Sequence, residues 1–148
     1  MPNLVDATFE NIAEEYVVPL VIRLMHSESN ILNIVSPEGK PFISALNFTI
    51  NNKNDGVFIM NLKTLKIKTN VLFEINLRVL KYSDKYDLDF NFRESNIIIF
   101  SNFLKEFHIY MTQLAMEFNV SIYYAGMEPA SDEHTRYFTC LENGPLNV

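Results

Sequence analysis

Cysteine, glycine and histidine are scarce in this sequence, and each shortage excludes a class of site. Cys140 is the single cysteine among 148 residues, so no disulfide can form within the chain, which favours a reducing compartment. The four glycines are scattered, and none lies in a phosphate-binding cluster before a helix, which excludes a nucleotide-binding loop. The three histidines and the cysteine lack metal-ligand spacing, so we expect no metal and no cofactor.

Long apolar runs and a targeting segment are also missing. The longest apolar run, residues 16–22, is interrupted by Pro19 and is far too short to cross a bilayer. The first residues lack the basic and apolar regions of a secretory signal. These absences predict a soluble, cytoplasmic protein that does not interact with membranes.

Basic residues are outnumbered, and the formal net charge is −6. The excess of acids lies in residues 1–30 and 84–148, whereas residues 31–83 are basic. An acidic total disfavours nucleic acid as a partner, because neutralising phosphates requires a concentrated basic surface. The one basic stretch, Lys63 to Lys68, lacks interleaved aromatic residues, so we interpret it as protection of an edge strand. A basic protein is the more natural partner.

The length and the apolar content indicate an ordinary globular chain. Nearly half of the residues are apolar, and 148 residues suffice to bury a core without disulfides or metals. No repeat, linker or low-complexity tract divides the sequence. We therefore expect residues 1–148 to form a single domain.

The first half of the chain reads as one helix followed by strands. Asp6 is a candidate N-cap, and four apolar residues then follow at helical spacing, namely Phe9, Ile12, Ala13 and Tyr16. This helix is expected to end before Pro19. Runs of branched aliphatic residues predict the next elements as strands, with the first two paired, at residues 20–25, 31–35, 42–50 and 57–61.

The second half gives clearer patterns. Strict alternation over residues 71–80 and again over 86–92 predicts an antiparallel hairpin. Its solvent face should place Arg78 and Glu74 near Asp87, Asp89 and Asn91. Residues 101–118 carry an apolar stripe over nearly five helical turns. Strands are expected at 120–124 and 135–140. The fold class is α+β, a mainly antiparallel meandering sheet packed against an N-terminal helix and a longer helix near 101–118.

The densest group of polar side chains lies in residues 126–140. Asp132, Glu133 and His134 are candidates for an acid/base pair or metal ligands, but consecutive residues rarely converge, and an Asx turn with a helix cap is the simpler interpretation. His134 also suggests activation of the Cys140 thiol, although a lone cysteine in an apolar stretch is more often a buried small residue.

Two further features indicate a protein interface. Tyr123 and Tyr124 precede Arg136, and tyrosine and arginine are enriched at the energetic centres of interfaces. Neighbouring residues of a strand point to opposite faces of the sheet, so only one of the two tyrosines can face the protein core. The other is then available to a partner. Asp87 and Asp89 lie on one strand face, where they either form paired carboxylates or a solvated face opposite Arg78.

The C-terminal part of the sequence resembles a known family. Residues 123–132 read YYAGMEPASD, and TRYFT and NGPL follow at residues 135–139 and 143–146. This region looks like the C-terminal part of bacterial immunity proteins that accompany polymorphic or contact-dependent toxins. The resemblance implies a cytoplasmic protein that binds and blocks a toxin domain, often a basic nuclease, by charge complementarity.

The leading hypothesis is therefore a non-enzymatic immunity protein that neutralises a basic toxin domain through an acidic surface. The candidate partner-binding residues are polar side chains from the predicted first helix, the hairpin and the C-terminal loop: Glu10, Glu14, Glu15, Asp87, Asp89, Tyr124, Glu128, Asp132, Glu133, His134 and Arg136. Two alternatives stay open. One is a small hydrolase or transferase that uses residues 126–140, and the other is a sensory domain with a ligand cavity beneath the second helix.

Overall fold

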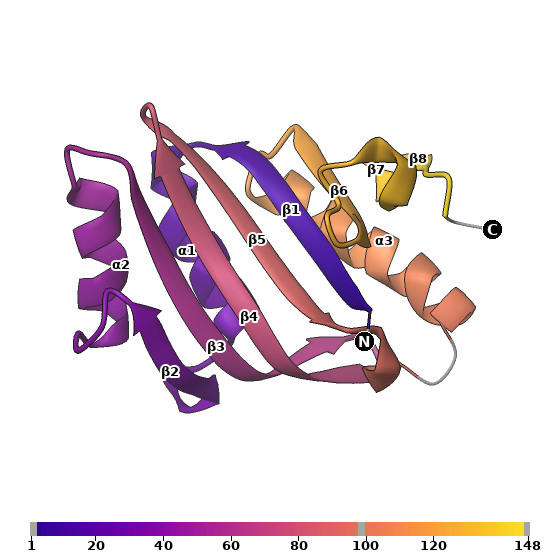
Figure 1. Ribbon diagram of the computed structural model, residues 1–148, viewed down its shortest axis with the longest axis horizontal. Helices are drawn as coiled ribbons and strands as arrows, with labels where there is room; N and C mark the ends of the chain where they lie inside the picture. The colour runs from indigo at the N-terminus through magenta and orange to yellow at the C-terminus, as the bar shows by residue number, and fades with distance from the viewer. Residues whose placement is uncertain (1–2, 98–99, 147–148) are drawn as a thin grey trace.

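The computed structural model describes residues 3–97 and 100–146, which form an eight-stranded antiparallel sheet with three helices (Figure 1). The helices are α1 (Glu14–Met25), α2 (Phe42–Asn51) and α3 (Phe100–Glu117). The strands are β1 (Leu4–Ile12), β2 (Ile31–Ser36), β3 (Gly56–Ile67), β4 (Asn70–Tyr82), β5 (Lys85–Arg93), β6 (Ile122–Met127), β7 (Arg136–Thr139) and β8 (Glu142–Asn143). Short 3₁₀ turns are η1 (Glu28–Asn30), η2 (Glu94–Asn96) and η3 (Glu133–Thr135).

The strand order is β2-β3-β4-β5-β1-β6-β7-β8, and every neighbouring pair is antiparallel. The expected meander is present from β2 to β5 and again from β6 to β8, but β1 is inserted between the two parts. Helices α1 and α3 lie behind the sheet in Figure 1, and α2 lies beside β3 near its edge. The predicted α+β class is confirmed, and one face of the sheet is left without a helix.

The core lies between the sheet and the three helices, and its aromatic part lies at α3. Five phenylalanine rings from β5, α3 and β7 contact one another with centroid separations of 5.2 to 6.4 Å, and these are Phe90, Phe92, Phe103, Phe107 and Phe138. All five side chains are buried. The apolar stripe predicted for residues 101–118 is thus the face that α3 buries, as its helical spacing indicates.

The predicted first helix is wrong, because residues 4–12 form strand β1. Val5, Ala7 and Phe9 are completely buried and alternate with Asp6, Thr8 and other partly exposed residues. This period of two fits a strand that is covered on one face. The helical spacing of Phe9, Ile12, Ala13 and Tyr16 was coincidental, since pairing with both β5 and β6 outweighs the local pattern.

Helix α1 begins at Glu14, runs through Pro19 and replaces the strand expected at residues 20–25. Its buried residues Val17, Leu20, Val21, Leu24 and Met25 recur at helical spacing. Pro19 is exposed, so water can reach the carbonyl that the missing proline N–H leaves unpaired. The expected pairing of residues 20–25 with 31–35 is therefore absent, and β2 pairs with β3.

Helix α2 replaces the strand predicted at residues 42–50. Phe42, Ala45, Leu46, Thr49 and Ile50 are buried, again at helical spacing. Branched residues and a preceding turn favoured a strand in the sequence, but the burial of this face against β3 selects the helix. The strand predicted at 57–61 is confirmed as part of β3.

The hairpin predicted from the alternating segments is confirmed as β4 and β5, with Arg78 opposite Asp89. The alternation changes phase within β4, at Glu74, which has a positive φ of 57°. Ile75, Leu77 and Val79 are buried, whereas Val71 and Phe73 are exposed and Leu72 is buried in their place. The predicted buried face therefore holds only for the second half of β4.

In the part of the chain that the structure describes, no helix is long and apolar enough to cross a membrane.

Candidate functional site

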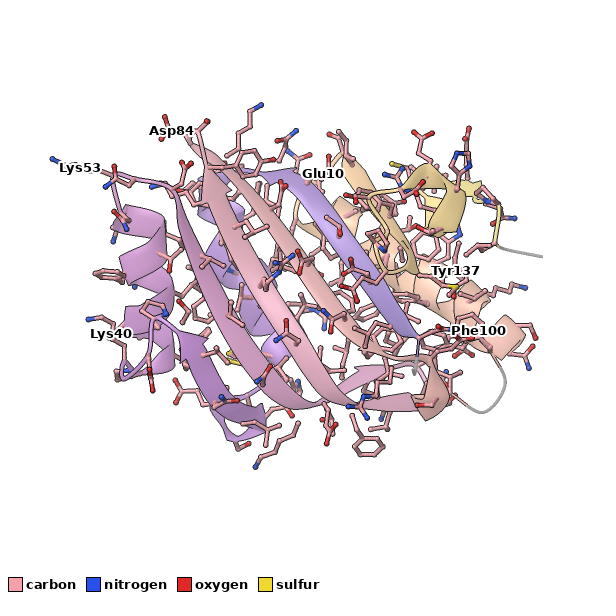
Figure 2. The ribbon with its side chains drawn as sticks, in the orientation of Figure 1. Glu10, Lys40, Lys53, Asp84, Phe100 and Tyr137 are labelled. Atoms are coloured by element: carbon pink, nitrogen blue, oxygen red, sulfur yellow. The ribbon has the colours of Figure 1, made fainter. Side chains whose placement is uncertain are left out.

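The face of the sheet opposite α1 and α3 is polar, and we call it the open face. Alternation and strand register place nine polar side chains of β3, β4, β5 and β1 on it: Asn61, Asn76, Arg78, Asp87, Asp89, Asn91, Asp6, Thr8 and Glu10. In Figure 2, Asp84 marks the turn between β4 and β5. Glu10 lies near the end of β1 that is closer to this turn. Four of these side chains are carboxylates, so the open face is acidic.

Arg78 and Asp89 form the central ion pair of the open face. Arg78 Nε donates to Asp89 Oδ1 at 3.0 Å, and Arg78 Nη2 donates to Asp89 Oδ2 at 2.7 Å. This bidentate contact raises the pKa of the Arg78 guanidinium. Asp89 is only 6% exposed, so its charge depends on this partner. The predicted position of Asp89 opposite Arg78 is confirmed, but the prediction of a solvated side chain is wrong for Asp89, which is buried.

Asp6 adds a second carboxylate beside this pair. Burial, followed by repulsion from the Asp89 and Glu128 carboxylates, raises the pKa of Asp6 to about 6 from an ordinary value of 3.8. Arg78 and the backbone N–H of Ala130 oppose this change. Asp6 is thus a carboxylate whose negative charge lacks sufficient compensation within the chain.

Replacing Asp6 with asparagine is expected to stabilise the fold at neutral pH. The folded state keeps the Asp6 proton to about pH 6, whereas the unfolded chain releases it near 3.8, so Asp6 lowers stability as the pH rises through this window. With partial exposure taken into account, Asp6→Asn should raise the free energy of unfolding by about 1 kcal/mol at pH 7.5 and leave it unchanged at pH 3.5. Urea titrations at both pH values measure this difference.

The matched control for this experiment is Glu133→Gln, which neutralises an exposed carboxylate on η3. We expect no pH-dependent gain from it. A gain of equal size at both pH values for Asp6→Asn, or a loss at pH 7.5, contradicts the assignment of Asp6 as a destabilising charge.

Tyr124 joins the open face to the C-terminal loop. Its hydroxyl donates to Glu10 Oε2 at 2.7 Å, and the Arg136 guanidinium lies 3.9 Å above the centre of its ring. Burial and the Glu10 hydrogen bond raise the pKa of Tyr124. Tyr124 does face away from the core, as expected, but it is only 4% exposed, because Arg136 covers it. The prediction that one tyrosine is free for a partner is therefore wrong.

Residues of the C-terminal loop pack over β1 and β6. Arg136 Nε donates to the Ala130 carbonyl at 2.8 Å, Arg136 Nη1 donates to Thr139 Oγ1 at 3.2 Å, and Ala130 is completely buried. Glu128 donates its backbone N–H to the Leu4 carbonyl. The loop therefore forms a fixed wall at one side of the open face, and Arg136 acts as its internal brace.

The other wall of the open face is the end of the β4–β5 hairpin. Asp87 accepts from the Tyr82 hydroxyl and from the Asn11 backbone N–H, both at 2.9 Å. These contacts fix the Asp87 carboxylate, and no ion pair to it is found within residues 3–97 and 100–146, so its charge remains available to a partner.

The loop acids do not assemble a catalytic centre. Asp132 accepts from the His134 backbone N–H at 3.0 Å and caps η3, which is the predicted Asx-type turn. Glu133 and His134 are exposed. Cys140 is half-buried, and its thiol lies 3.4 Å from the Ser121 carbonyl. Because Asp132, Arg136 and Cys140 each face different partners, they lack the convergence that a hydrolase or transferase requires.

Glu14 and Glu15 lie apart from the other candidates, at the start of α1. Glu14 Oε1 accepts from the Tyr86 hydroxyl at 2.7 Å, and Tyr86 belongs to the buried, helix-covered side of β5. Glu15 is exposed. Among the described residues, no group of three or more histidine, cysteine or acidic side chains could hold a metal ion.

Sequence reasoning missed Asp6 and treated Arg78 only as a structural residue. Asp6 was interpreted as a helix cap, although its alternation with Val5 and Ala7 was the signal for a strand and hence for the open face. Five candidates named from the sequence lie around this one surface in the structure: Asp89, Asp87, Glu10, Glu128 and Arg136. That they bind a partner stays a prediction.

Comparison with known proteins assigns the chain to a family. Residues 3–143 match the family model described as the PABL017 Cdi1I immunity protein. The chain is also similar to a chain in the 1.75 Å crystal structure of the toxic C-terminal tip of CdiA from Pseudomonas aeruginosa in complex with its immune protein. The identity is 25%, the match covers 99% of each chain, and the TM-score is 0.82. No curated protein matches the sequence.

The resemblance to bacterial immunity proteins that the sequence indicated in its C-terminal part is thus confirmed over nearly the whole chain. The family match and the similarity to a chain in a complex of a toxin tip with its immune protein support a toxin-neutralising immunity function. The chain belongs to the PABL017 Cdi1I immunity protein family.

Proposed function

We propose that this chain acts as one cytoplasmic domain that binds a basic toxin domain without catalysis, and that the open face is the contact surface. The match to an immunity protein family over residues 3–143 carries the neutralising function. The similar crystal structure, in which an immune protein is bound to a toxin tip, supports a toxin as the partner.

The charge of the open face supports its role in this contact. Glu10, Asp87 and Asp6 lie around the Arg78–Asp89 pair, and Glu128 adds a carboxylate from the loop. A basic residue of the toxin that approaches Asp6 would supply the positive charge that this group lacks. Such complementarity accelerates association and orients the partners. The exposed Asp132 and Glu133 extend the acidic rim on the same loop.

Binding kinetics with purified toxin domain test the choice of surface. The double variant Glu10→Gln with Asp87→Asn is expected to lower the association rate constant about tenfold at low salt, and the difference should shrink at high salt. The matched control, Glu15→Gln with Glu28→Gln, removes the same charge from exposed positions on α1 and η1. We expect it to leave the rate constant nearly unchanged.

Two outcomes would contradict the proposal in distinguishable ways. If the control variant slows association and the open-face variant does not, the surface is wrong, but the immunity function stands. If the unmodified protein fails to protect cells that co-express the adjacent toxin gene, the neutralising function itself is wrong.

A further inference from the structure

A cavity of about 490 Å³ lies on the helix side of the sheet, away from the open face. Its walls come from the end of α1, from η1, from β3 and β4, and from the middle of α3. The volume falls within the range of small-molecule sites. This cavity takes no part in the proposed toxin contact.

The wall formed by η1 is fixed by a partly buried hydrogen-bond network around Asn30. The Asn30 amide donates to the carbonyls of Met25 and Thr64 at 2.9 and 2.8 Å. Its Oδ1 accepts from the Thr64 N–H and hydroxyl at 3.0 and 3.1 Å. These four hydrogen bonds join the end of α1 to β3, so the shape of the cavity is set before any ligand enters.

Two of the polar side chains that line the cavity are cations, which donate hydrogen bonds and cannot accept them. Arg23, His26 and Lys66 reach it from α1, from the residue after α1 and from β3, and none of its lining residues is acidic. Glu117 pairs with Arg23 at 3.5 Å, but both side chains are about half exposed, so the contact is weak. Arg23 and Lys66 thus place two positive charges at one cavity in a chain whose net charge is −6.

Tyr110 completes the donor set from α3. Within the described residues, neither the Tyr110 hydroxyl nor the Lys66 ammonium has a hydrogen-bond partner. Burial raises the pKa of Tyr110 to about 12, so the hydroxyl keeps its proton and can donate. Lys66 is exposed and Tyr110 is half-buried, so a ligand that accepts hydrogen bonds and carries negative charge can reach both groups by displacing water.

The remaining wall is apolar. Leu24 and Leu65 are buried and Val71 is exposed, and together they form a surface against which an uncharged part of a ligand can pack. The cavity therefore combines a cationic end with an apolar side. An inorganic anion would use only the first of these.

We propose that this cavity binds a small organic phosphate, with its phosphate group at Arg23 and Lys66 and its uncharged body against Leu24, Leu65 and Val71. A phosphate dianion matches the two positive charges of Arg23 and Lys66, and the Arg23 guanidinium suits its oxygen geometry. The Tyr110 hydroxyl donates to the same ligand.

Isothermal titration of the full-length protein with AMP at low salt tests this site. AMP should bind saturably, whereas adenosine and inorganic phosphate, which each lack one half of the ligand, should bind at least about tenfold more weakly. Arg23→Gln and Lys66→Gln should each weaken AMP binding about tenfold, the usual effect of losing a charged hydrogen bond. Lys85→Gln, at the exposed β4–β5 turn, is the matched control and should not change it.

Backbone amide shifts should locate the ligand, with the largest changes at residues 26–30 and 64–66. The proposal is overturned if AMP shows no saturable binding, if adenosine or inorganic phosphate binds as tightly as AMP, or if the shifts lie elsewhere. It is also overturned if Lys66→Gln weakens toxin binding while AMP fails to bind, because the cavity would then receive an acidic segment of the toxin.

Discussion

Replacing Arg78 with methionine is expected to lower the free energy of unfolding by about 3 kcal/mol, because the change leaves the buried Asp89 carboxylate without its cation. Both oxygens of Asp89 accept from the Arg78 guanidinium, and Asp89 is 6% exposed. Methionine retains much of the apolar length of arginine. The loss of stability therefore measures the missing charge and hydrogen bonds, and not a cavity. Urea titration at pH 7.5 measures the effect.

Removing both charges should restore most of this stability. In the double variant Arg78→Met with Asp89→Leu, no buried carboxylate is left unpaired, and replacing buried ion pairs with apolar residues is often close to neutral. Arg93→Met, which removes an exposed arginine from the same hairpin, should cost less than about 0.5 kcal/mol. A double variant as unstable as Arg78→Met alone would show that packing, and not the unpaired charge, causes the loss.

The pH dependence of Arg78→Met gives a second readout. Arg78 lowers the pKa of Asp6, so its removal should raise that pKa further. The destabilisation by Arg78→Met should therefore grow as the pH rises and the two carboxylates ionise side by side.

The hairpin of β4 and β5 and helix α3 could be predicted from the sequence because their patterns are long. Strict alternation across two segments joined by a short turn fixes a register, and that register alone places Arg78 opposite Asp89. The stripe of α3 is repeated over nearly five turns, so chance agreement is small. Both features depend on residues that are close in the sequence.

Helices α1 and α2 could not be predicted because their local composition favours the wrong structure. Val17, Val18, Val21 and Ile22 are branched residues with high strand propensity, and Pro19 among them suggests a helix end. Each helix is nonetheless selected by a buried face that only the assembled sheet provides. Apolar residues at positions 17, 20, 21, 24 and 25 do have helical spacing in the sequence. The strand propensity of the branched residues among them favours the other interpretation.

The sequence predicted which polar residues belong to the candidate site, but not how the fold brings them together. Glu10 and Asp89 become neighbours of the C-terminal loop only because β1 is inserted between β5 and β6. That topology joins the two ends of the chain, and no local pattern specifies it. The raised pKa of Asp6 has the same origin, since Asp89 and Glu128 belong to other strands and loops.

Replacing Gly126 with alanine is expected to lower the free energy of unfolding by about 3 kcal/mol, at the upper end of the effects of overpacking. A methyl group at Gly126 would lie 2.7 Å from the Arg136 Cα and closer still to the Thr135 carbonyl oxygen. Both neighbours are backbone atoms, so β7 would have to move away from β6. Urea titration measures the loss of stability.

The movement of β7 should also displace side chains at the open face. Arg136 would leave the ring of Tyr124, and the loop that places Glu128 beside Asp6 would lose its brace. We therefore expect Gly126→Ala to weaken toxin binding as well as folding. The control is Gly56→Ala, where the added methyl group meets its nearest neighbour at an ordinary 3.5 Å and should change neither property. If both variants lose the same stability, the close approach of β7 is not the reason for glycine at position 126. The conformational freedom of the glycine backbone would then be the reason.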